Sequence, residues 1–98
     1  MLEGYWVYIL KCSDGSLYTG CTSDISRRLS AHLSGRASKY TRSRLPVTLG
    51  HVEKAADRGS ALKREAQIKK LTRREKLSLC RAYEAKKRNG HPLASPNQ

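Results

Sequence analysis

The chain opens on a run of apolar and aromatic residues that is typical of a β-strand. Residues 5–12, YWVYILKC, are mostly aromatic or β-branched and predict a first strand. Residues 13–16, SDGS, predict a tight turn, because Gly15 tolerates a positive φ angle. Residues 17–21 read as a second short strand, so the three segments together predict a hairpin.

The length of the hairpin loop decides which side chains share a face of the sheet. A two-residue loop at Asp14-Gly15 places Tyr8 and Tyr18 on opposite faces. A three-residue loop, with Gly15 in a left-handed bulge, sets Tyr8 opposite Gly20 and puts both tyrosines on one face. The pattern leaves both registers open, but a site that uses both tyrosines requires the second one.

Beyond the hairpin, the apolar positions change to a helical spacing. The oxygen-bearing side chains at 22–24 can cap a helix, and Gly35 can end it. One face of this first helix carries Ile25, Arg28, Leu29 and His32. The polar, basic stretch at 36–46 is predicted to be a loop.

Two further helices follow a third strand, which is predicted over 47–52. Asp57 or Ser60 can cap the second helix, over roughly 60–71. The TRRE sequence at 72–75 fits a capping box and begins a third helix that runs to about Arg88.

This order of elements, β-β-α-β-α-α, predicts a mixed α/β (α+β) domain with helices packed on a small three-stranded sheet. With 98 residues the chain is expected to form one domain at 1–90, followed by a disordered tail at 91–98. No apolar run approaches the roughly 20 residues that a membrane span needs. The run at 5–10 lacks a basic leader and reads as a strand rather than a secretory signal.

The charge of the chain indicates its partner. Twenty Lys and Arg against eight Asp and Glu give a formal net charge of +12, which attracts polyanions. Nucleic acid is the expected polyanion. An acidic membrane surface fits less well, because the basic helices lack Trp or Phe anchors. Charge alone does not separate DNA from RNA, or catalysis from binding.

The three cysteines favour a reducing compartment. Cys12, Cys21 and Cys80 are odd in number and contain no Cys-x-x-Cys pair, so neither a disulfide framework nor a zinc site is expected. We therefore expect free thiols and a cytoplasmic protein, associated with the nucleoid if the source is bacterial.

Glu65 is the most informative single residue. On a helical wheel its neighbours on both sides are apolar, namely Ala61, Leu62, Ala66 and Ile68. A carboxylate in the middle of an apolar face is costly unless it is paired, hydrogen-bonded or metal-bound. One interpretation is a partly buried ion pair with an arginine. The other is a ligand for Mg²⁺, which prefers oxygen and often takes only one or two carboxylates.

Other candidate side chains lie on the hairpin and the first helix. Arg28 and His32 are four residues apart, so a guanidinium for phosphate oxygens and an imidazole for proton transfer share a face. The alternative is a basic face exposed to solvent, with a histidine whose hydrogen bonds are all made within the protein. Tyr8 and Tyr18 are either packing residues of strands or phenols whose pKa a metal and an arginine lower enough to activate water.

Taken together, these segments resemble the GIY-YIG nuclease superfamily, and especially its short stand-alone bacterial members. The likeness covers residues 5 to about 80. Five short motifs carry it in order: VYIL at 7–10, DGSLYTG at 14–20, RRL at 27–29 with His32, KYTR at 39–42, and ALKRE at 61–65. Each motif alone is weak, but five in the right order and spacing are specific.

The resemblance implies a three-stranded antiparallel sheet flanked by helices. It also implies one divalent metal, Mg²⁺ with Mn²⁺ as a substitute, and hydrolysis that leaves a 5′-phosphate. By position, Tyr8 and Tyr18 match the two tyrosines of the family, and Gly20 matches the close-packed glycine after the second.

Three further positions match residues that the family uses in catalysis. Arg28 matches the arginine that stabilises the transition state, His32 a position tied to proton transfer, and Glu65 the metal ligand. The first triplet reads WVY at 6–8 instead of Gly-Ile-Tyr. Cys21 stands where some relatives carry a lysine, which puts a basic contact there in doubt.

These features predict a metal-dependent DNA endonuclease, structure-specific and linked to DNA repair or recombination, with RNA left open as a substrate. Tyr8 or Tyr18 helps to deprotonate water, His32 relays the proton, and Arg28 neutralises the developing charge. The residues expected to grip the nucleic-acid backbone are Arg36, Lys39, Tyr40, Arg42, Arg44, Lys63, Arg64, Lys69 and Lys70.

Two alternatives belong to other classes. One is a non-catalytic nucleic-acid-binding protein on the same scaffold, and the other is a nuclease module that is active only with a protein partner. The first predicts decay at the catalytic positions, yet all six are present. Cleavage of both strands requires a homodimer or sequential nicking, because the sequence predicts one site.

Overall fold

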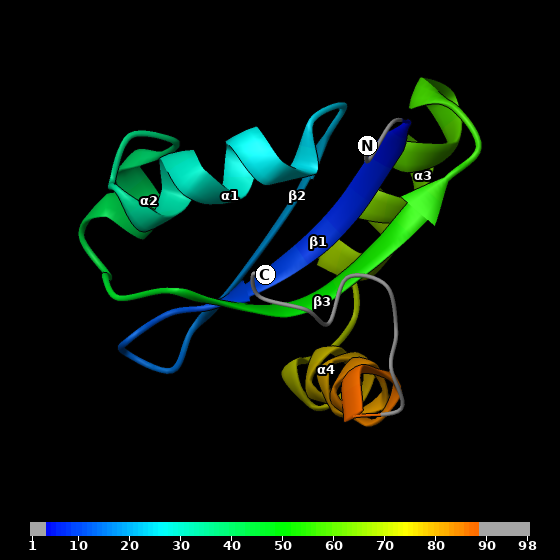
Figure 1. Cartoon of the computed structure of the whole chain (residues 1–98). Helices are drawn as coiled ribbons and strands as arrows, with labels where there is room; N and C mark the ends of the chain where they lie inside the picture. Colours follow the sequence, from blue (N-terminus) through cyan, green and yellow to red (C-terminus); the bar gives the residue numbers. More distant parts are fainter. Residues whose placement is uncertain (1–3, 89–98) are drawn as a thin grey trace.

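The computed structural model describes residues 4–88, and the tail predicted at 91–98 lies outside the described residues. Its centre is a three-stranded antiparallel sheet in the order β2-β1-β3 (Figure 1). The strands are β1 (Tyr5–Lys11), β2 (Leu17–Thr22) and β3 (Thr48–Ala55). The predicted fold class, and the predicted order of elements along the chain apart from one added helix, are therefore confirmed.

Four helices accompany the sheet in the described range, and one of them was not expected. They are α1 (Ile25–Leu33), α2 (Lys39–Arg42), α3 (Arg58–Lys69) and α4 (Arg73–Arg88). The prediction of a loop throughout 36–46 is wrong at α2. Ser38 caps this short helix by accepting a hydrogen bond from the amide of Thr41, whose side chain is buried. Among residues 4–88, no helix is both long and apolar enough to cross a membrane.

The capping signals in the sequence are used as hydrogen bonds. Asp57 rather than Ser60 caps α3, by accepting from the Ser60 amide at 2.7 Å, so the helix begins two residues earlier than expected. Thr72 and Glu75 form the predicted capping box, each side chain accepting from the other's backbone amide at 3.2 and 2.9 Å.

Strand β3 extends beyond its predicted range of 47–52. Its last residues are Glu53 to Ala55, which pair with the start of β1. The charged residues Glu53 and Lys54 interrupt the apolar pattern, so the sequence does not predict this part of the strand. One of them, Glu53, is held in place by ion pairs rather than by apolar packing.

The hairpin adopts the three-residue loop. Gly15 has a φ of 86°, and its amide donates to the carbonyl oxygen of Cys12 at 3.0 Å. Strand β1 consequently pairs Tyr8 with Gly20. The register that places Tyr8 and Tyr18 on one face is thus the one observed.

Strand β1 is buried on both faces, each of which has its own core. Trp6, Tyr8 and Leu10 pack on one side with Ile25 of α1. Val7 and Ile9 pack on the other side with Ala61 and Ile68 of α3. Helix α4 contacts β3 and contributes to both cores, and Figure 1 shows α1 and α2 side by side, apart from α3.

The buried stripe of α3 is narrower than predicted. Ala61 and Ile68 are fully buried, but Leu62 is 44% exposed, so the expectation that it faces the core is wrong. The side chains that flank the stripe are Arg64 and Glu65. Arg64 reaches Glu53 on β3, whereas Glu65 reaches β2. Helix α3 therefore carries Glu65 to the β2 edge of the sheet.

Candidate active site

A buried chain of hydrogen bonds links the sheet to α1 and α2. The hydroxyl of Tyr8 lies 2.9 Å from Nε2 of His32, and Nδ1 of His32 lies 2.9 Å from Oγ1 of Thr41. All three residues are at most 1% exposed. The Thr41 hydroxyl lies 3.5 Å from the carbonyl oxygen of Ser38 and 3.3 Å from its Oγ, and when it donates to either of them its oxygen accepts from Nδ1–H of His32. Nε2 of His32 is then the acceptor for the Tyr8 proton.

Burial sets the protonation states in this chain. It raises the pKa of Tyr8 to about 12, although the nearby Arg28 guanidinium acts in the opposite direction. With these neighbours alone, Tyr8 is a neutral phenol at pH 7. Burial, and then the positive charge of Arg28, lowers the pKa of His32. The imidazole is neutral at pH 7 and free to accept a proton at Nε2.

The lowered pKa of His32 predicts a pH dependence of stability. The unfolded chain takes up a proton near pH 6.5, while the folded chain takes it up only at lower pH. The free energy of unfolding should therefore fall as the pH drops below 6.5, by at most about 1.4 kcal/mol per pH unit. Urea unfolding between pH 7 and 5 measures this slope. The slope should be smaller in His32→Gln, and equal slopes in the two proteins would refute the assignment.

Gly20 is required because Tyr8 occupies the space where its side chain would be. A Cβ at this position would lie 2.6 Å from the Tyr8 hydroxyl oxygen. The match of Gly20 to a close-packed glycine thus has a physical cause: the phenol lies against the backbone of β2. The hydroxyl keeps its contact with His32 only while this space stays empty.

We expect Gly20→Ala to destabilise the fold by about 1–3 kcal/mol, because the buried Tyr8 ring must move. Thermal unfolding measures the loss. Gly59→Ala is the matched control, since its nearest non-neighbouring atom is 3.6 Å away and the position is helical. Equal stability of Gly20→Ala and wild type would show that the ring moves freely.

Glu65 meets β2 on the other face of the sheet. Its Oε1 accepts a hydrogen bond from the Cys21 thiol at 3.3 Å, and its Oε2 lies 3.1 Å from Nζ of Lys69. The carboxylate side chain is 18% exposed. The ion pair proposed from the sequence therefore exists, but its cation is a lysine on the same helix rather than an arginine.

Arg28 lies between the two faces. Its side chain is exposed, and its charge reaches Tyr8 on one face and Cys21 on the other. Burial raises the pKa of the Cys21 thiol, as does the neighbouring Glu65, while Arg28 lowers it in part. A hollow of about 290 Å³ adjoins this arginine, lined by Thr22, Ser23, Asp24, Arg27, Arg28 and Ala31.

Tyr18 is the more accessible of the two site tyrosines. It is partly exposed, whereas Tyr8 is fully buried. Its ring meets the edge of the His32 ring, with centroids 5.2 Å apart. It also lies close enough to Tyr8 to raise the pKa of that phenol, after burial and against Arg28. Tyr8, Tyr18, Arg28 and His32 are therefore in mutual proximity.

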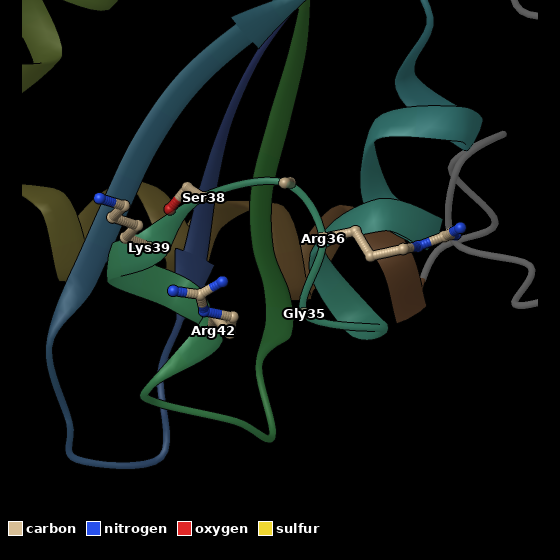
Figure 2. A pocket seen from close by; sticks show the side chains of 6 residues that line it. Gly35, Arg36, Ser38, Lys39 and Arg42 are labelled. Atoms are coloured by element: carbon tan, nitrogen blue, oxygen red, sulfur yellow. The ribbon is translucent and has the colours of Figure 1, made fainter.

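The basic residues expected to grip a nucleic acid fall into two groups. Arg36, Lys39 and Arg42 line a hollow of about 350 Å³ beside α2. Figure 2 shows Arg36 pointing away from Lys39 and Arg42, so these cations spread along a surface and do not converge on one point. No ion pair within residues 4–88 involves them. Lys63 and Lys70 are exposed as well and make no ion pair within residues 4–88.

The remaining members already have protein partners. Nε of Arg64 lies 3.0 Å from Oε1 of Glu53, which also pairs with His51. These contacts lower the pKa of Glu53, His51 first and Arg64 after it, against the effect of burial. Arg64 therefore joins α3 to β3. Lys69 pairs with Glu65, and Tyr40 and Arg44 contact each other beside Tyr18.

The donor set suits a hard cation. Within the described part of the chain, no three His, Cys, Asp or Glu side chains come together as a metal site. A Mg²⁺ ion needs only one or two carboxylates, because substrate phosphate and water complete its shell. One oxygen of the Glu65 carboxylate contacts the Cys21 thiol and the other contacts Lys69, and a carboxylate oxygen offers two lone pairs. Glu65 is therefore a fitting single protein ligand.

Sequence reasoning missed Thr41 and Cys21. Thr41 lies within the KYTR stretch, but only the fold brings it to Nδ1 of His32. Cys21 follows the second triplet and pairs across the hairpin with Val7, which turns its thiol toward α3. Side chains alternate between the two faces of a strand, so the sequence could have predicted that Cys21 faces α3, opposite to the face of Gly20.

The fold and the clustered side chains define the class: a basic α+β domain in which two tyrosines, a histidine and an arginine gather at one edge of the sheet. A family model described as the GIY-YIG catalytic domain matches residues 4–78. The chain belongs to this GIY-YIG family, which is a family of nucleases, so its substrate class is nucleic acid.

Relatives and solved structures agree with this membership. A UPF0213 protein of Syntrophus aciditrophicus is 56% identical over 75 residues, which cover 76% of this chain and 86% of that protein. The solution structure of EF2693 from E. faecalis has 41% identity and a TM-score of 0.57, covering 86% of this chain and 93% of the other. The UPF0213 protein BH0048 of Bacillus halodurans has 39% identity and a TM-score of 0.53, covering 92% and 89%.

Proposed function

We propose that this chain is a divalent-metal-dependent endonuclease that hydrolyses phosphodiester bonds in DNA. The observation that carries the proposal is the bond of 2.9 Å between Tyr8 and a neutral, buried His32, beside the exposed Arg28. A histidine that only stabilises the fold does not need an arginine and a second tyrosine beside its ring. A site that takes a proton from water next to an anionic phosphate needs both.

The proton path begins at Tyr18, because it is the exposed phenol of the pair. The attacking water gives a proton to the Tyr18 oxygen, Tyr18 releases its own proton to a water that bridges to Tyr8, and Tyr8 takes up that proton while it passes its own to Nε2 of His32. His32 ends as an imidazolium, and the hydroxide attacks phosphorus. A neutral Tyr8 with a pKa of about 12 suits a relay, which accepts and donates at once, better than it suits a phenolate base.

Two charged side chains act on the phosphate. Arg28 donates to its non-bridging oxygens and offsets the charge that develops in the transition state. Glu65 would hold the metal, Mg²⁺ or Mn²⁺, which supplies charge neutralisation at the leaving 3′-oxygen when bound. The product then carries a 5′-phosphate.

The exposed cations hold the rest of the nucleic acid. Arg36, Lys39 and Arg42 offer a spread of positive charge beside the site, which suits an extended backbone better than a single anion. Lys63 and Lys70 add charge on α3. Branched, flapped and damaged DNA are the substrates to compare, because a role in DNA repair or recombination predicts a preference among structures.

The decisive experiment is cleavage of a labelled panel of DNA. The panel holds single-stranded, duplex, flap and four-way-junction DNA, each with Mg²⁺, with Mn²⁺ and with chelator. Metal-dependent cutting that leaves 5′-phosphate ends supports the proposal. Binding without cutting, in all metals, would instead make the chain a binding module or a nuclease subunit that needs a partner.

A further inference from the structure

We infer that Asp14, Arg44 and Tyr40 form an aromatic brace that fixes the ring of Tyr18, so that Tyr40 and Arg44 are positioning residues rather than contacts to nucleic acid. This inference rests on the proposed function, in which Tyr18 meets the attacking water. It changes the role of Tyr40 and Arg44, which the sequence assigns to the grip on the nucleic-acid backbone.

The ring of Tyr18 contacts two other rings. It stacks on Tyr40, with centroids 5.8 Å apart and planes inclined by 29°. It also meets the edge of the His32 ring, with centroids 5.2 Å apart and planes inclined by 60°. Arg44 lies over the ring of Tyr40, with its Cζ 3.8 Å from the ring centroid.

Arg44 is itself fixed at several points. Its Nε lies 2.9 Å from Oδ2 of Asp14, and its Nη1 donates to the carbonyl oxygen of Tyr40 at 3.0 Å. Its own carbonyl oxygen accepts from the Ser13 amide at 3.0 Å. Asp14 in turn accepts from the amide and hydroxyl of Ser16. The guanidinium is thus engaged on its face and edge, which makes it a poor phosphate ligand.

The position of Tyr18 explains why such a brace is needed. Strand β2 is an edge strand, so no further strand packs beside Tyr18. A half-exposed side chain at an edge has several accessible rotamers. Proton transfer requires one of them, because a misplacement of about 1 Å at a reacting group can cost 100-fold in rate. The aromatic brace selects that rotamer.

Kinetic constants distinguish positioning from binding. We expect Tyr40→Ala to lower kcat about tenfold with KM little changed, because Tyr18 populates unproductive rotamers. Tyr40→Phe keeps the stacking ring and should retain the kcat of wild type. If Tyr40 gripped the backbone through its hydroxyl, both variants would raise KM and leave kcat alone, which would overturn the inference.

Arg44 offers a second test with a matched control. Arg44→Lys keeps the charge but loses the planar face over Tyr40, so kcat should fall in the same direction as in Tyr40→Ala. Arg74→Ala removes one exposed positive charge from α4 and should leave kcat unchanged. An Arg44→Lys variant with normal kcat and raised KM would contradict the brace.

A readout without substrate separates this inference from the proposed function. The NMR signals of the Tyr18 ring and of Cε1–H of His32 should shift in Tyr40→Ala and return in Tyr40→Phe, with thermal stability checked in both. Unchanged signals would overturn the brace even if the enzyme is active. Shifted signals in a chain that cuts no DNA would keep the brace and reject the nuclease proposal.

Discussion

Glu65→Gln is expected to lower the rate of DNA cleavage by about 1,000-fold, because the metal ion that Glu65 would hold at the leaving oxygen is worth several kcal/mol. Glutamine keeps the size of the side chain and an oxygen for the Cys21 thiol. It loses the charge that would hold the cation and that pairs with Lys69. Single-turnover cleavage at saturating Mg²⁺ measures the rate, and Mn²⁺ binding followed by electron paramagnetic resonance measures the site itself.

The matched control for Glu65 is Glu53→Gln. Glu53 is also a partly buried carboxylate held by a cation of α3, but it lies on the β3 side of that helix. Its replacement should reduce stability, through the loss of Arg64 and His51 contacts, while cleavage and Mn²⁺ binding stay near wild type. Equal losses of activity in the two variants would mean that Glu65 serves only to hold the fold.

Arg28→Lys is expected to lower kcat by about 100- to 1,000-fold, the cost of removing one preorganised donor from a transition state. Lysine keeps the positive charge but cannot contact two phosphate oxygens in one plane. KM should change little, because the contact strengthens as charge develops. Steady-state cleavage of the preferred DNA gives both constants.

Arg28→Ala adds a readout that needs no substrate. Removing this positive charge should raise the pKa of His32, since Arg28 is the second cause of its lowering after burial. Titration of the imidazole signals by NMR measures this shift. Arg27→Ala is the control, as the adjacent exposed arginine on α1, and should leave both kcat and the His32 pKa unchanged. A His32 pKa that does not move would place Arg28 away from the pocket.

The sequence predicts most of the fold, because its signals are local. The Thr72–Glu75 capping box, the Asp57 cap and the glycine turn at Gly15 each depend on residues within a few positions. Two choices were left open: whether Asp57 or Ser60 caps the second helix, and the register of the hairpin. A shared face for Tyr8 and Tyr18 required the bulged loop, and the observed pairing of Tyr8 with Gly20 has it.

What the sequence missed depends on contacts across the chain. Helix α2 is only four residues long, and its buried Thr41 is held by His32, which lies nine positions earlier. A helical wheel placed Leu62 on the apolar face of α3, but its side chain is 44% exposed. The engagement of Arg44 by Asp14 joins two loops 30 residues apart. The catalytic roles of the site residues stay predictions.

The sheet divides the site into two parts that different helices supply. The tyrosines and His32 lie on the face covered by α1, while Glu65 and Cys21 meet on the face covered by α3. Only the thin edge of β2, at Gly20, separates them. Because of this partition, α3 can be redesigned separately from the tyrosines and His32. If Glu65 holds the metal as proposed, a different donor at position 65 should change which ion binds and leave the Tyr8–His32 contact in place.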